Sequence, residues 1–118
     1  MDVQIDRPMD SSQVEIIIPI AVNDVDSLLF SIPYIKKHLT WKKIVIIADK
    51  KVEHQLCGIR DICFIDENDL IDGMTFSKVK SIISKIYPKA IRRTGWYFQQ
   101  FLKLAYAYKC ETEYYLTW

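Results

Sequence analysis

The stretch VEIIIPI, residues 14–20, decides the fold because its β-branched residues form an almost unbroken apolar run. A strand covered on one face alternates apolar and polar residues, whereas a strand covered on both faces is apolar throughout. The run KIVIIAD, residues 43–49, repeats this pattern. Residues 62–65 (ICFI) predict a shorter third strand, and residues 113–118 (EYYLTW) predict a fourth.

Helical spacing of apolar residues separates these strands. It covers residues 25–39, with Asp24 as a candidate cap, and residues 76–86, with Thr75 as a candidate cap. A third helix is predicted over residues 95–109, GWYFQQFLKLAYAYK. Right-handed crossovers then give an α/β fold with an open, mostly parallel, Rossmann-like sheet in the order 3-2-1-4 and helices on both faces.

Composition limits the architecture to one domain. The chain has 118 residues, half of them apolar, so we expect a flexible tail over residues 1–13 and a single domain over residues 14–118. A net charge of +1 gives no long-range field that favours nucleic acid or an anionic membrane. The chain lacks a leader pattern, CxxC spacing and any apolar run of about 18 residues, so we expect a cytoplasmic protein without a membrane span.

Several familiar sites are disfavoured. Three glycines cannot supply the usual phosphate-binding loops, and two isolated histidines do not indicate zinc. Cys63 stands in a strand pattern and is expected to be a buried structural cysteine rather than a nucleophile. The acidic cluster at residues 66–72 lacks the spacing of a calcium loop, so we expect a solvated turn.

The polar residues of the 95–109 helix are more informative. Gln99 and Gln100 precede Lys103 by four and three residues, so the three share one polar face. Arg92 and Arg93 come just before this helix, where guanidinium groups and free backbone amides could hold a phosphate. A solvated helix face with two surface arginines explains the same spacing equally well.

Three segments together resemble the amino-terminal half of GT-A fold nucleotide-sugar glycosyltransferases, particularly the bacterial DUF6492-like family. They are VEIIIPIAVND, IVIIADK and, most specifically, RRTGWYFQQFLKLAYAYKCETEYYLTW, so the resemblance covers residues 14–118. In that family a Gly-Trp-x-x-Gln-Gln-x-x-Lys-Leu helix leads into the strand that carries an Asp-x-Asp motif.

The resemblance implies a donor site. The loop after the first strand, with Pro19, Ile20 and Ala21, and the acidic end of the second strand, Asp49, would hold the nucleotide. Arg93 would be a further nucleotide contact. Gln100 and Lys103 would contact the sugar or the diphosphate. The implied ligand is a nucleoside-diphosphate sugar, bound weakly, and the implied role is in surface polysaccharide or lipid-linked glycan synthesis.

The sequence departs from the family at residues 114–118, YYLTW, where Asp-x-Asp would follow. We therefore expect a truncated GT-A domain that holds no metal itself, although a complete family member would use Mn²⁺ or Mg²⁺. We also expect no transfer activity from these residues, and self-association through the uncovered fourth strand, with Tyr114, Tyr115 and Trp118 exposed. The alternative is a non-catalytic module that binds a nucleotide or a partner chain.

Overall fold

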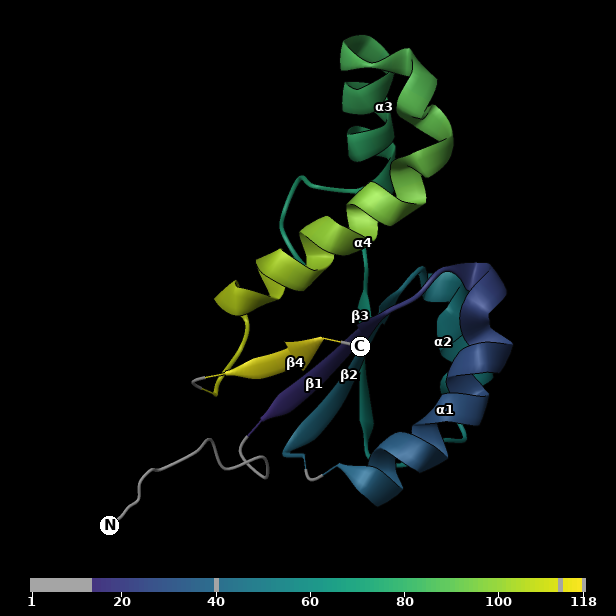
Figure 1. Ribbon diagram of the computed structural model, residues 1–118, viewed down its shortest axis with the longest axis vertical. Coiled ribbons are helices and arrows are strands. Elements are labelled where there is room, and N and C mark those ends of the chain that lie inside the picture. The colour runs from purple at the N-terminus through teal and green to yellow at the C-terminus, as the bar shows by residue number, and fades with distance from the viewer. Residues whose placement is uncertain (1–13, 40, 113, 118) are drawn as a thin grey trace.

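A four-stranded parallel sheet in the order β3-β2-β1-β4 forms the centre of the molecule (Figure 1). The computed structural model describes residues 14–39, 41–112 and 114–117, so the predicted tail and Trp118 lie outside the described residues. The strands are β1 (Glu15–Pro19), β2 (Lys43–Ala48), β3 (Ile62–Asp66) and β4 (Tyr115–Thr117). The predicted fold class, strand order and parallel direction are confirmed.

The two central strands are buried on both faces, as their almost unbroken apolar runs predict. Alternate residues point to opposite sides of a strand, so Ile16 and Ile44 pack in one cluster while Ile17 and Val45 pack in another. Parallel strands need this double cover because their crossovers place helices over the faces of the sheet.

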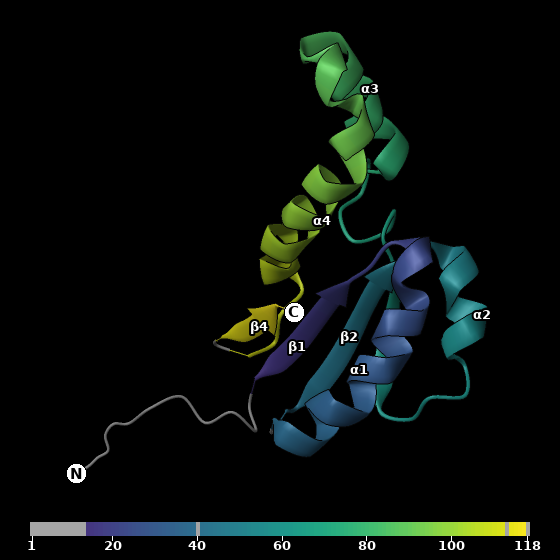
Figure 2. The ribbon, with the colours of Figure 1, turned by 45° about the vertical axis from the view of Figure 1, so that its right-hand side comes forward.

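One face is covered by α1 (Val25–His38) and α2 (Glu53–Leu56), which lie side by side in Figure 2. Short 3-10 turns precede them, η2 (Val22–Asp24) before α1 and η3 (Lys50–Val52) before α2. The expectation that the Asp24 side chain caps α1 is wrong, since it makes no capping hydrogen bond. The η2 turn instead runs directly into α1 and orders its first residues.

The other face is covered by α4 (Thr94–Ala105), followed by the 3-10 turn η5 (Tyr106–Tyr108). The helix predicted over residues 95–109 is therefore α-helical only to Ala105. Before it come α3 (Phe76–Ile86) and η4 (Pro88–Arg93). The predicted Thr75 cap of α3 is confirmed, because its hydroxyl oxygen accepts a hydrogen bond from the Lys78 backbone N–H at 3.1 Å.

Helix α3 does not lie over the sheet but beyond its carboxyl end, together with the first turns of α4 (Figures 1 and 2). This arrangement contradicts the expectation for Cys63, which is exposed. Cys63 lies on the edge strand β3, and the helix that covers this face, α4, packs over the central strands.

Strand β4 is the other edge of the sheet, and its side chains differ in exposure. Tyr115 packs edge-on against Tyr106 with ring centroids 5.3 Å apart, and its hydroxyl donates to the Lys103 carbonyl at 2.5 Å. Tyr114 is exposed, so the expectation that both tyrosines are uncovered is correct for Tyr114 alone. Self-association through this edge stays a prediction.

A charged side chain, Glu15, is completely buried in the central strand β1. Its carboxylate accepts hydrogen bonds from the Tyr106 hydroxyl and, at 3.1 Å, from the Glu111 backbone N–H. Burial, followed by the hydrogen bond and the charge of Glu15, raises the pKa of Tyr106 above its usual range, so this phenol remains a donor.

In the described residues no helix is long and apolar enough to cross a bilayer.

Candidate functional site

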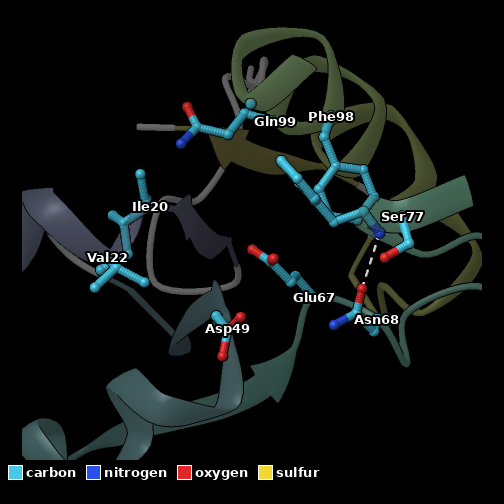
Figure 3. A pocket seen from close by; sticks show the side chains of 11 residues that line it. Ile20, Val22, Asp49, Glu67, Asn68, Ser77, Phe98 and Gln99 are labelled. Carbon is cyan, nitrogen blue, oxygen red and sulfur yellow. Dashed lines mark hydrogen bonds between the residues drawn. The ribbon is translucent and has the colours of Figure 1, made fainter. Parts of the chain in front are cut away.

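A pocket of about 280 Å³ opens at the carboxyl ends of β1, β2 and β3 (Figure 3). Open α/β sheets bind ligands beyond this edge, usually where the order of the strands reverses. Here the order reverses between β1 and β4, whereas the pocket lies on the side of β1, β2 and β3. Three strand ends and the first turns of α3 and α4 supply the lining residues, which are Ile20, Ala21, Val22, Asp49, Glu67, Asn68, Phe76, Ser77, Gly95, Phe98 and Gln99. In the part of the chain that the structure describes, every residue of this lining is neutral or acidic.

Two carboxylates from neighbouring strands define one wall. Asp49 follows β2, and its Oδ1 accepts a hydrogen bond from the Lys51 backbone N–H at 3.0 Å, which fixes the side chain as the cap of η3. Glu67 follows β3, and its backbone N–H donates to the Ala48 carbonyl at 2.8 Å. Parallel pairing therefore brings both acids to one edge, and Figure 3 shows the Glu67 carboxyl directed into the pocket.

The Glu67 carboxyl has a pKa close to neutral pH. Burial raises its pKa from 4.5 to about 7; the charges of Asp49 and Asp66 add to the rise, while Lys51 opposes it. A carboxyl with this pKa exchanges a proton near neutral pH, so it can either donate or accept a hydrogen bond there.

This shift predicts a pH-dependent stability. The folded pKa of Glu67 exceeds its unfolded value, so the native state binds more protons between about pH 4.5 and 7. The stabilisation is complete below pH 4.5 and is lost as the pH rises through 7. We expect Glu67→Gln to remove this slope and to raise the free energy of unfolding at pH 8, because glutamine places no charge in the partly buried position. The expected gain is only about 1 kcal/mol, because water screens the half-exposed group.

Urea unfolding of both proteins from pH 4 to 8 measures the effect, and a carboxyl carbon NMR titration reads the pKa directly. Asp69→Asn is the matched control, since Asp69 is exposed in the same turn and outside the pocket lining. Parallel stability curves for the parent and Glu67→Gln would contradict the assignment.

The opposite wall is aromatic and rests on a fixed turn. Asp66 accepts a hydrogen bond from the Asn68 backbone N–H at 3.0 Å, and Asn68 Oδ1 accepts one from the Phe76 N–H at 2.9 Å. These bonds attach the start of α3 to the end of β3. The rings of Phe76 and Phe98 then meet edge to face, with centroids 5.8 Å apart.

The structure brings only some of the expected site residues together. Ile20, Ala21 and Asp49 line the pocket. Pro19 lines a separate cavity of about 170 Å³ between β1 and α1. Arg93 is exposed, with its guanidinium carbon 5.7 Å from the centre of the Trp96 ring.

Gln100 and Lys103 are half-buried on α4 and do not line this pocket; the polar residue of α4 that does is Gln99. The helical positions explain the difference. The buried residues Phe98 and Leu102 face the sheet, and Gln99 lies nearer to this face than Gln100 or Lys103 does.

Sequence reasoning missed Glu67, Asn68 and Gln99. The turn after β3 resembled a solvated acidic loop. However, β3 is parallel to β2, and β2 is followed directly by Asp49. Acids that come directly after two neighbouring parallel strands were the available signal, because such positions meet at one edge of the sheet.

Among the described ranges, no group of three or more histidine, cysteine, aspartate or glutamate side chains could hold a metal ion. The pocket supplies two lining carboxylates, Asp49 and Glu67.

No family model, curated protein sequence or solved structure matches this chain.

Proposed function

We propose that the chain binds the nucleoside end of a nucleoside-diphosphate sugar, as the donor half of a bacterial glycosyltransferase. The observation that supports this best is the placement of Asp49 and Glu67 in a pocket at the carboxyl ends of three parallel strands. Ribose hydroxyls and base N–H groups are hydrogen-bond donors, and two carboxylates are suited to accept from them.

The shape and charge of the pocket define which part of the ligand enters. A volume of about 280 Å³ is at the small end of the range for small-molecule sites, so a nucleoside suits it better than the whole sugar nucleotide. Phe76 and Phe98 offer apolar surface to a base. An acidic lining repels phosphate, so the diphosphate and sugar extend outward from the pocket.

Sugar transfer and a role in polysaccharide synthesis are the further part of the proposal, and the sequence resemblance alone supports them. Mn²⁺ or Mg²⁺ belongs to the same part, as the expected metal of a complete family member.

The binding proposal predicts a specific ligand series. We expect uridine, or another nucleoside from a panel of five, to bind within a few-fold of its diphosphate and of its diphosphate sugar, because the acidic pocket holds only the nucleoside. Asp49→Asn should weaken binding about tenfold, since a hydrogen bond to a charged group is lost. Asparagine still caps η3, so the fold is preserved.

Titration calorimetry with the parent chain, Asp49→Asn and the exposed control Asp69→Asn makes the comparison, and the control should change affinity less than twofold. Equal affinity for the parent and Asp49→Asn would remove this residue from the site. A chain that binds none of the nucleosides, nucleotides or sugar nucleotides would overturn the proposal.

A further inference from the structure

The charges of the chain are strongly segregated. The helical hairpin, defined here as residues 76–105, contains no Asp or Glu. It carries seven Lys and Arg residues, which are Lys78, Lys80, Lys85, Lys89, Arg92, Arg93 and Lys103. Because the whole chain is formally +1, everything outside the hairpin has a net charge of −6, so the near-neutral total conceals a strongly basic part.

These cations are available for contacts with a partner. Six of the seven are exposed, and Lys103 is half-buried. In the described part of the chain, ion pairs join Lys36 to Asp61 and Lys43 to Glu111, all of them outside the hairpin.

The same hairpin exposes apolar side chains. Ile86 and Leu104 are each 76% exposed, and Trp96 is 54% exposed. A groove of about 290 Å³ runs between α3, η4 and α4, and its lining is aliphatic and aromatic: Val79, Ile82, Ile83, Ile86, Tyr87, Ala90 and Tyr97. Soluble proteins rarely leave an apolar surface of this kind uncovered unless it binds something.

The hairpin is also placed to reach a surface. Its α3 helix and the first turns of α4 project beyond the sheet, away from α1 and α2 (Figures 1 and 2). On α3, Ile82 and Ile86 form an exposed apolar stripe. Lys78 lies four residues before Ile82 and Lys85 lies three residues after it, so both cations lie beside this stripe. Long lysine side chains beside an apolar stripe can keep their ammonium groups at the lipid headgroups while the stripe enters the membrane.

We propose that the helical hairpin docks on an anionic membrane surface. Its cations contact lipid phosphates, and Ile82, Ile86 and Trp96 enter the boundary between headgroups and acyl chains. Nucleic acid fits less well, because it would use the cations and leave an aliphatic groove uncovered. Docking does not require a bilayer-crossing helix, and it is independent of what the pocket binds.

Vesicle flotation of the full chain tests the proposal. We expect binding to phosphatidylcholine vesicles that contain 30% phosphatidylglycerol and no binding to pure phosphatidylcholine. Each basic residue at an anionic surface strengthens the partition roughly fivefold, so Lys85→Gln with Lys89→Gln should weaken it about 25-fold. The matched control is Lys37→Gln with Lys42→Gln, which removes the same charge outside the hairpin and should change the partition less than twofold.

A second pair of variants tests the apolar contact. Ile82→Ser with Ile86→Ser keeps every charge and alters only exposed side chains, and it should weaken the partition at least tenfold with unchanged circular dichroism. Three results would overturn the proposal: no binding to anionic vesicles, an equal loss from the hairpin and control lysine pairs, or full binding by the serine pair. Tight binding of a single-stranded oligonucleotide without vesicle binding would indicate nucleic acid instead.

Discussion

Glu15→Ala is expected to lower the free energy of unfolding by about 3 kcal/mol, a large part of the stability of a domain of this size. Glu15 is completely buried in the central strand, and its carboxylate accepts from the Tyr106 hydroxyl and the Glu111 N–H. Alanine leaves both donors without an acceptor inside the core and also creates a cavity. Urea unfolding at pH 7 measures the loss.

Two further variants separate these contributions. Tyr106→Phe removes one donor and should cost about 1.5 kcal/mol, and the double variant should cost less than the sum of the two, because both residues share one hydrogen bond. Glu111→Gln is the control and should cost under about 0.5 kcal/mol, since its side chain is exposed and its backbone N–H is retained. A loss below 1 kcal/mol for Glu15→Ala would show that the core does not depend on this carboxylate.

Phe98→Ala is expected to cost about 4 kcal/mol, the usual loss when a phenylalanine is removed from a core. Phe98 is 1% exposed, and it joins α4 to the cluster beneath the sheet that contains Ile17 and Val45. Its ring also meets Phe76 of α3 and forms a wall of the pocket. The change therefore loosens the attachment of the helical hairpin and opens the proposed nucleoside site at once.

Thermal unfolding together with hydrogen exchange of the α4 amides measures the effect. Tyr108→Ala serves as the control, because it also removes an aromatic ring but from a residue that is 86% exposed, and it should cost under about 0.5 kcal/mol. If both variants unfold alike, Phe98 does not anchor the hairpin.

Much of the fold could be predicted from the sequence, because local patterns were strong. The run at residues 14–20 is apolar except for Glu15, and β1 is covered on both faces. The Thr75 cap of α3 could be predicted because it depends only on residues three positions apart in the sequence. Asp24 was predicted wrongly because the η2 turn runs directly into α1. Cys63 was predicted wrongly because its exposure depends on how far α4 extends over the sheet.

Less of the candidate site could be predicted from the sequence. Asp49 could be nominated from the end of its strand, whereas Glu67 acquires its raised pKa only through burial and the nearby charges of Asp49 and Asp66. Choosing between Gln99 and Gln100 required the rotation of α4 about its axis, which depends on how Phe98 and Leu102 pack. Net charge concealed the basic hairpin because the rest of the chain cancels it.

The pairing of β1 with β4 has a consequence for the order in which the chain folds. β1 pairs with β2 across fewer than thirty residues, but its other edge pairs Glu15 with Tyr115, a hundred positions along the chain. Closing so long a loop is entropically costly, and contacts of this kind slow folding. During synthesis β1 and β2 can join while the ribosome still holds the remainder, and β1 keeps one edge unpaired until residues 115–117 have emerged. For the part of that interval before Tyr106 and Glu111 emerge, the carboxylate of Glu15 lacks both of its partners.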